Sequence, residues 1–315
     1  MKLGKALVGF IFLSCFYLGI LIWIDSRNHI LNQLHLLVHA ISVLMCLSFC
    51  SYVLRYIRWH WLLSRSGYYV GWGYGFLGYL AGFAFTATPG KVGELIRIRY
   101  FTRAGVPSTI SFGAFVYERA LDLIVVLILS ALVISRPELL ILALSFVTIF
   151  VGLLAILSLN PILVTKLSGI FSKLAFHKLA KFILIIRNGL ASCRMWFTPI
   201  DLMVSFTCGF FAWGITSYSF MWLLNDVGIS IEPISAFTIY PLAMLSGAAS
   251  MLPGGVGSTE LTIVLLLSNY AVPVILATLS AIAIRFTTIW FAVLTGFICL
   301  GILEIKIGKS KIFEN

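Results

Sequence analysis

Two stretches decide the fold: Pro89-Gly90-Lys91-Val92-Gly93-Glu94-Leu95 and, later in the chain, Pro253-Gly254-Gly255-Val256-Gly257-Ser258-Thr259-Glu260-Leu261. We call them the first and the second Pro-Gly segment; the second carries two additional residues. Downstream, Ala104-Gly105-Val106-Pro107 matches Tyr270-Ala271-Val272-Pro273, and the same offset of 166 positions places Arg119 on Arg285. Three matches in one register predict a duplicated structural unit.

The composition places the chain in a membrane. Of its 315 residues, 61% are hydrophobic and 10% are charged, and the mean hydropathy is +1.06. Apolar stretches that suit a hydrocarbon core of ~30 Å occupy residues 5–24, 34–54, 109–134, 139–158, 201–223 and 274–302. Two further stretches, 71–88 and 234–252, are rich in Gly and end at the Pro-Gly segments, which would interrupt a helix. We therefore expect an all-α polytopic membrane bundle and not a soluble enzyme.

The positive charges predict how the chain crosses the membrane. In a soluble protein a net charge of +11 would suggest nucleic acid, but here the cations alternate to one side of the predicted spans. By the positive-inside rule this side is the cytoplasm. The cations on it are Lys2, Lys5, Arg55, Arg58, Arg65, Lys166, Lys173, Lys178, Lys181, Arg187, Arg194, Lys306, Lys309 and Lys311. We expect a multi-pass protein of the bacterial cytoplasmic (inner) membrane with both termini in the cytoplasm and no nucleic-acid partner.

The repeat and the charges together predict the domain organisation. Residues 1–315 form one membrane domain, with a first repeat at about 34–158 and a second at about 201–305. Lysines alternate with apolar residues in the linker 160–198, which is predicted to lie on the cytoplasmic leaflet or to form a solvated linker helix. The first Pro-Gly segment is expected to enter from the cytoplasm and the second from outside. The halves would then be inverted-topology repeats with two re-entrant Pro-Gly elements.

Charged residues inside predicted spans are costly and are therefore candidates for function. Glu118 and Asp122 stand four apart and share one helix face, with Arg119 beside them. Two interpretations remain open. These groups form a buried structural ion pair that locks the spans together, or Arg119 and Arg285 bind a passing phosphate while Glu118 and Asp122 balance the cations or exchange protons.

The Pro-Gly segments are candidate anion sites. A flexible turn that leads into a helix offers backbone N–H groups, and Lys91 adds a cation in the first copy only. Arg97, with Arg99 and Arg103, either extends this basic surface or anchors the chain to acidic lipid. The predicted backbone sites comprise Pro89, Gly90, Gly93 and Glu94 in the first copy and Pro253, Gly254, Gly255, Gly257 and Glu260 in the second. Glu94 and Glu260 are expected to cap or neutralise helix starts, and the glycines alternatively serve close helix packing.

Other chemistry has little support in the sequence. His35 and His39 stand four apart, but no third metal ligand is near them, so we expect no metal site. Motifs typical of hydrolases, nucleotide binding and zinc proteases are missing, and we predict no catalytic residue and no cofactor.

The motifs reached so far, together with Leu252 before the second Pro-Gly segment and Glu118-Arg119 with Asp122, resemble the lysylphosphatidylglycerol synthase transmembrane (flippase-like) family over nearly the whole chain. In bifunctional members of that family a soluble aminoacyl-transferase domain follows the membrane domain. Because this chain ends at Asn315, we expect no aminoacyl transfer. The resemblance implies a flippase-like protein for an anionic lipid, either a phospholipid or a polyprenyl-phosphate-linked sugar.

Three functions are compatible with these observations. In the leading one, the protein translocates an anionic membrane lipid whose phosphate contacts Lys91, Arg119 and Arg285. In the second, it is a non-transporting partner that scaffolds a lipid-modifying or glycosyl transferase. In the third, Glu118 or Asp122 is the base of an integral-membrane transferase, although the sequence carries no pattern that would bind a sugar donor.

Overall fold

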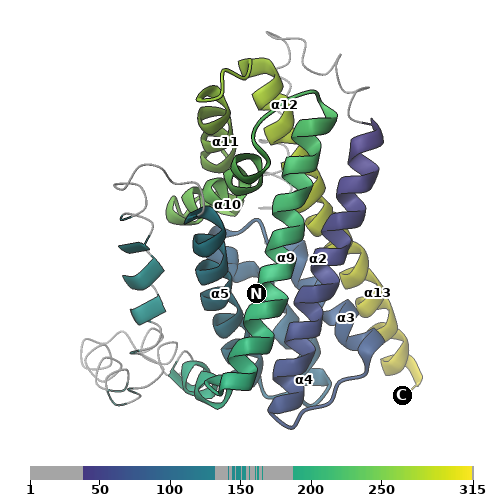
Figure 1. Ribbon diagram of the computed structural model, residues 1–315. Coiled ribbons are helices and arrows are strands. Elements are labelled where there is room, and N and C mark those ends of the chain that lie inside the picture. The colour runs from purple at the N-terminus through teal and green to yellow at the C-terminus, as the bar shows by residue number, and fades with distance from the viewer. Residues whose placement is uncertain are drawn as a thin grey trace, which may run out of the picture.

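The computed structural model describes residues 38–131, scattered positions between 141 and 165, and residues 187–313. These residues form helices and no strands (Figure 1). The α-helices are α2 (Val38–Arg65), α3 (Trp72–Ala81), α4 (Arg97–Arg103), α5 (Ser108–Ala131), α9 (Pro199–Asp226), α10 (Pro233–Ala249), α11 (Ser258–Ser268), α12 (Val274–Arg285) and α13 (Phe291–Phe313). Short 3₁₀ segments cover Gly82–Phe85, Pro89–Ile96, Cys193–Trp196 and Pro253–Gly255. The predicted span 5–24, half of 139–158 and most of the linker lie outside the described residues.

Within the described ranges, three helical stretches are long and apolar enough to cross a membrane: Ala40–Arg65, Pro199–Asp226 and Val274–Ile307. They correspond to the predicted spans 34–54, 201–223 and 274–302, although the first continues a further eleven residues to Arg65. The predicted span 109–134 forms α5, a helix of 24 residues that carries the charged group around Glu118. The predicted all-α membrane bundle is therefore confirmed.

The long helices form the frame of the molecule. Helices α2 and α9 lie side by side along most of their length (Figure 1). Helix α9 begins where the backbone N–H of Asp201 donates to the Thr198 hydroxyl, with Pro199 at the first helical position. Helices α12 and α13 form one continuous rod with a single π turn at Phe286–Trp290. Such turns are frequent at functional sites, and this one directly follows Arg285.

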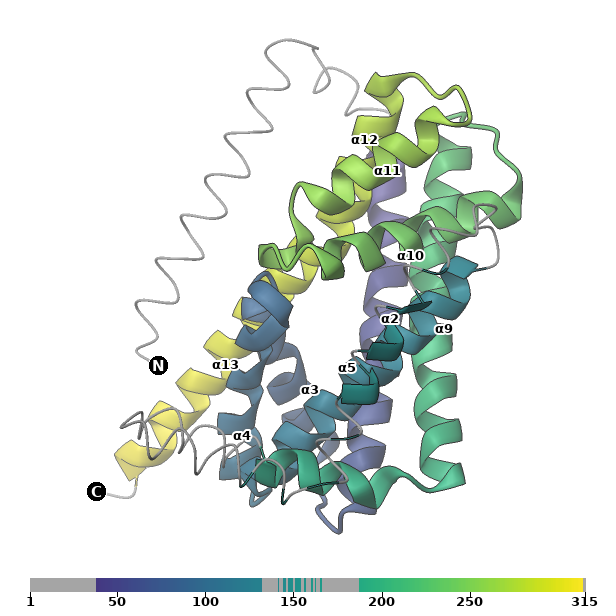
Figure 2. The ribbon, with the colours of Figure 1, turned by 90° about the vertical axis from the view of Figure 1, so that its left-hand side faces the viewer.

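Two helical hairpins fill the space between the long helices. Helices α3 and α4 flank the first Pro-Gly segment at the lower end of the molecule, and α10 and α11 flank the second at the upper end (Figure 2). The 3₁₀ segments at the two Pro-Gly turns pack against each other. The hairpins thus approach one another from opposite ends of the bundle. Which side of a membrane each hairpin faces, and hence the inverted topology, stays a prediction.

The backbone conformations of the two Pro-Gly turns agree position by position. Gly90 and Lys91 have φ angles of 58° and 56°, and the matching Gly254 and Gly255 have 62° and 65°. This left-handed conformation costs a residue with a side chain roughly 1–2 kcal/mol, whereas glycine adopts it freely. The similarity of the two turns supports the duplication read from the sequence, and it makes Lys91 the member of the four that is strained.

Close packing of small residues brings the first hairpin against the rod. Gly296 of α13 faces the segment Gly82–Phe85, and a Cβ atom at this glycine would lie 2.1 Å from the backbone nitrogen of Ala84. Close approach through small residues is typical of helix packing in membranes. The contact fixes the first hairpin relative to the rod that carries Arg285.

Candidate functional site

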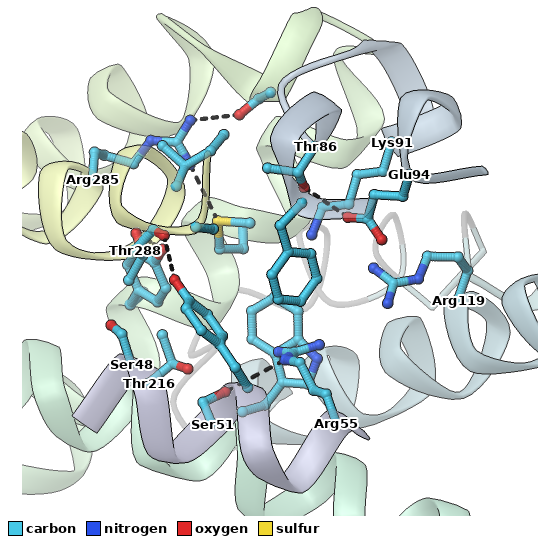
Figure 3. A pocket seen from close by; sticks show the side chains of 18 residues that line it. Ser48, Ser51, Arg55, Thr86, Lys91, Glu94, Arg119, Thr216, Arg285 and Thr288 are labelled. Atoms are coloured by element: carbon cyan, nitrogen blue, oxygen red, sulfur yellow. Dashed lines mark hydrogen bonds between the residues drawn. The ribbon is translucent and has the colours of Figure 1, made fainter. Parts of the chain in front are cut away.

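A basic cavity lies where the two Pro-Gly turns meet. It is partly open to its surroundings. Its charged lining residues come from both halves of the chain: Arg55, Lys91, Glu94, Arg119 and Arg285. Hydroxyl groups line much of the rest: Ser48, Ser51, Tyr52, Thr86, Thr216, Tyr240 and Thr288. Figure 3 shows Lys91 and Arg119 on one side of the space and Arg285 with Thr288 on the other.

The predicted substrate-binding residues divide into two groups. Lys91, Arg119 and Arg285 line the cavity. Arg97, Glu118 and Asp122 do not line it and are buried in the ion-pair network beside it. The structure therefore brings the three cations of the leading hypothesis to one space and places the other three residues in the supporting network.

Glu118 and Asp122 point inward from one face of α5, as their spacing predicts. The Nη2 atom of Arg58 donates to both, at 2.9 Å to Glu118 Oε1 and 2.8 Å to Asp122 Oδ1. The Tyr79 hydroxyl also donates to Glu118, at 2.7 Å, and Arg55 Nη1 donates to Asp122, at 3.0 Å. Arg58 and Glu118 are fully buried, so these are charges in the interior of the bundle.

The expectation that Arg55 and Arg58 lie beyond the end of the span 34–54 was wrong, whereas the side of the membrane on which they lie stays a prediction. Helix α2 continues to Arg65, and both arginines are buried. The positive-inside rule counts cations near the end of an apolar stretch, but it does not detect carboxylates that a distant helix supplies. With Glu118 and Asp122 opposite them, the two guanidinium groups are stable inside the bundle.

The prediction that Arg97 belongs to a basic surface was also wrong. Arg97 is fully buried, with its guanidinium 4.7 Å from the ring centroid of Trp59 and 4.5 Å from that of Tyr79. It pairs with Glu94 and lies 3.5 Å from Glu118. Ring faces and carboxylates replace the water that an arginine at an interface would contact.

The two matched glutamates differ in role. Glu94 is buried and does not cap a helix; it accepts a hydrogen bond of 2.7 Å from Thr86 and pairs with Arg97. Glu260 does cap, since its carboxylate accepts the backbone N–H of Gly257 at 2.7 Å at the start of α11. The prediction of helix capping therefore holds for the second copy and fails for the first.

The matched arginines also have different surroundings. Arg285 donates from Nε to Glu260 at 2.9 Å and from Nη2 to the carbonyl oxygen of Gly254. The Nη2 atom of Arg119 forms ion pairs with Asp122 at 3.2 Å and with Glu118 at 3.6 Å, without hydrogen-bond geometry, and its Nε atom is buried without a hydrogen bond. Arg285 therefore ties the second Pro-Gly turn to its own helix, whereas Arg119 retains donor capacity beside the cavity.

Lys91 differs from the other cations that line the cavity. Its side-chain amine forms no hydrogen bond or ion pair with any of the described residues. Its side chain extends into the cavity from the first Pro-Gly turn (Figure 3). Its backbone has the strained φ of 56°. Strain of this kind is concentrated at functional sites, and it makes Lys91 the leading candidate for ligand contact.

The backbone amides of the Pro-Gly turns are largely occupied. The N–H groups of Lys91 and Gly93 donate to the carbonyl and hydroxyl oxygens of Thr88. Gly255 donates to the Leu252 carbonyl, and Gly257 donates to Glu260. At these four positions the backbone N–H groups already have acceptors, so they are not free to bind an anion.

Sequence reasoning identified only part of this site. It singled out Lys91, Arg119 and Arg285 through the repeat, and it missed Arg55, which also lines the cavity and stacks 4.7 Å from the ring of Trp213. The position of Arg55 inside a long apolar stretch was the signal that could have identified it. Within the described ranges no three His, Cys, Asp or Glu side chains are grouped to hold a metal ion. His35 lies outside those ranges, and His39 lies in the first turn of α2.

The fold and the site define an all-helical membrane protein with a basic, hydroxyl-lined cavity inside the bundle. The comparison with known families agrees with this class. The chain belongs to the family of the lysylphosphatidylglycerol synthase TM region, whose sequence profile matches residues 6–296. This match confirms the resemblance seen in the sequence and relates the protein to lipid handling. Neither a curated protein nor a solved structure shows a significant match to the chain.

Proposed function

We propose that the protein translocates an anionic lipid between the two leaflets of the membrane, with the phosphate of the headgroup bound in the basic cavity. Moving a phosphate through hydrocarbon is prohibitive because a charge loses its hydration there. A cavity lined by cations and hydroxyls substitutes for that hydration, while the lipid tails remain in the bilayer. Membership in a family of lipid-handling membrane domains supports this substrate class.

Lys91 is the observation that carries the proposal. The turn that holds it could be built from glycine, as the matching Gly255 demonstrates. A lysine at this position strains the backbone and places an unpaired amine in the cavity. Structural roles do not require that amine, whereas binding of an anion does.

Arg119 and Arg285 complete the proposed contacts from the other walls of the cavity. Arg119 has two buried nitrogen atoms that form no hydrogen bond. Arg285 sits at the junction of α12 with the π turn and contacts the second Pro-Gly turn. A phosphate among these groups would contact the first hairpin through Lys91 and would be linked to the second through the hydrogen bond from Arg285 to Gly254, so its binding could couple to their movement.

The experiment is leaflet transfer of fluorescent anionic lipids in vesicles that contain the purified protein, with Lys91→Gly as the test variant. Because glycine relieves the strained conformation, this variant should fold as stably as the wild type or more stably, by roughly 1 kcal/mol. Its transfer rate should nevertheless fall by about tenfold or more, as expected when a charge-assisted hydrogen bond is lost. Lys91→Arg should retain most of the activity.

Lys306→Met is the matched control because Lys306 is an exposed lysine of α13 away from the cavity. It should transfer lipid at the wild-type rate. Transfer by Lys91→Gly at the wild-type rate would refute the role of Lys91. If the wild type moves no anionic lipid and a lipid-modifying or glycosyl transferase co-purifies with it, the scaffold function replaces transport.

A further inference from the structure

The charges around the cavity do not balance. Among the described residues, the ion-paired network beside the first Pro-Gly turn, taken together with the neighbouring Lys91, contains five basic side chains and three carboxylates, which leaves an excess of two positive charges. The basic members are Arg55, Arg58, Lys91, Arg97 and Arg119, and the acidic members are Glu94, Glu118 and Asp122. The neighbouring Arg285–Glu260 pair is neutral.

The excess sits inside the bundle. All three carboxylates are at most 4% exposed, and Arg58 and Arg97 are fully buried. The pairs Arg65–Asp201 and Arg99–Glu304, in which the arginine side chains are exposed, are separate from the network and are each neutral. An uncompensated charge in a low-dielectric interior is costly, so the cavity requires negative charge from a ligand.

The excess charge is located on the cavity side of the network. Arg58 and Arg97 are enclosed by carboxylates and aromatic rings away from the cavity. Arg55, Lys91 and Arg119 line the cavity together with the carboxylate of Glu94. Asp122 pairs with both arginines, and Glu118 lies 3.6 Å from Arg119. Because Glu94 and Glu118 also pair with the buried Arg97 and Arg58, a ligand in the cavity meets more positive than negative charge.

We infer that the cavity selects a dianionic phosphate group, either a phosphomonoester or a diphosphate, over a singly charged phosphodiester. A phosphomonoester carries about −1.5 to −2 charges at pH 7, which matches the excess of the network, whereas a phosphodiester would leave about one positive charge unneutralised. The inference rests on the proposed function in one respect, which is that the phosphate belongs to a lipid. The phosphate could also be free in solution, because the charge argument is the same for both.

The test compares fluorescent lipids with identical tails and three headgroups: phosphatidic acid, phosphatidylglycerol and phosphatidylcholine. Transfer rates are measured in vesicles at pH 7.5, and the rate in protein-free vesicles is subtracted. Wild-type protein should transfer phosphatidic acid about tenfold faster than phosphatidylglycerol. This ratio corresponds to the lower end of the free energy of a hydrogen bond to a charged group. Lys91→Gly, which reduces the excess to one charge, should bring this ratio close to one. Lys91→Arg and Lys306→Met should preserve it.

A binding measurement separates the sources of the phosphate. The shift in Tm of the detergent-solubilised protein is measured with short-chain phosphatidic acid, with short-chain phosphatidylglycerol and with inorganic phosphate. A shift with phosphatidic acid alone assigns the site to a lipid, and a shift with inorganic phosphate as well shows that the site recognises the phosphate group itself. Either result supports dianion selectivity, provided that Lys91→Gly reduces the shift.

The failures can be told apart. Equal transfer and equal Tm shifts for the monoester and the diester would overturn the inference and leave the proposed transport intact. A selective Tm shift with phosphatidic acid but no leaflet transfer would overturn the transport function and leave the charge selectivity intact. A preference that Lys91→Gly does not change would also overturn the inference, because the excess charge would not be its origin.

Discussion

The substitution Arg58→Met tests whether the buried ion pairs hold the bundle together. Arg58 has a fully buried side chain that donates to Glu118 at 2.9 Å and to Asp122 at 2.8 Å. Removing one partner of a buried pair costs about 3–5 kcal/mol because the other charge stays buried. Each carboxylate keeps other cations within 3.6 Å, so we expect a loss of stability near the lower end, about 3 kcal/mol.

Arg65→Met is the control, with the same exchange on the same helix. The Arg65 side chain is 47% exposed, and its partner Asp201 also accepts hydrogen bonds from Trp61 and Thr198. Exposed ion pairs contribute about 0.2–1 kcal/mol. The free energy of unfolding is measured in mixed micelles by titration with a denaturing detergent, followed by circular dichroism. Equal losses for the two variants, or a loss below about 1 kcal/mol for Arg58→Met, would refute the assignment of Arg58 to a structural network.

Three further outcomes follow from the packing, the ion pairs and the topology. Gly296→Ala should destabilise the protein by about 1–3 kcal/mol, because its Cβ atom would meet the backbone of the first hairpin, whereas Gly301→Ala, with open space around it, should be neutral or slightly stabilising in the same unfolding titration. Glu260→Gln should lower the rate of lipid transfer at least severalfold, since it removes the charge that holds the arginine of the second repeat; an unchanged rate in vesicles would show that this pair has no part in transport. In a cysteine-free background, Tyr69→Cys between α2 and α3 and Tyr270→Cys between α11 and α12 should react with an impermeant thiol reagent from opposite sides of the membrane, and labelling of both from one side would contradict the inverted topology.

The lengths of the helices show how sequence reasoning succeeds and where it stops. The apolar stretches of the sequence predicted α2, α9 and the rod of α12 and α13, because a helix that crosses a bilayer needs a long uncharged segment. The end of α2 escaped this reasoning, since Arg55 and Arg58 look like the start of a cytoplasmic loop. Their true environment depends on α5, whose carboxylates are sixty or more positions away in the sequence.

Glu94 and Glu260 show the same limit within one pair of matched residues. The repeat aligns them, and local sequence predicts a cap for both. In the structure Glu260 caps its helix, whereas Glu94 forms an ion pair with Arg97. Short-range rules describe the start of a helix well, but they cannot anticipate a buried arginine that competes for the same carboxylate.

By itself, the sequence determined that the chain lies in a membrane, that its described core is helical, that two Pro-Gly turns interrupt it, and which arginines correspond. These properties follow from hydropathy, from backbone preferences and from register, all of which are local. Only the tertiary structure decided which cations face the cavity and which are neutralised behind it. Arg119 and Arg97 have the same charge and lie in neighbouring helices, yet one lines the cavity and the other is enclosed by rings and carboxylates. The partner of a charge is set by the distance between side chains in space, and hydropathy and spacing along the chain do not contain that distance.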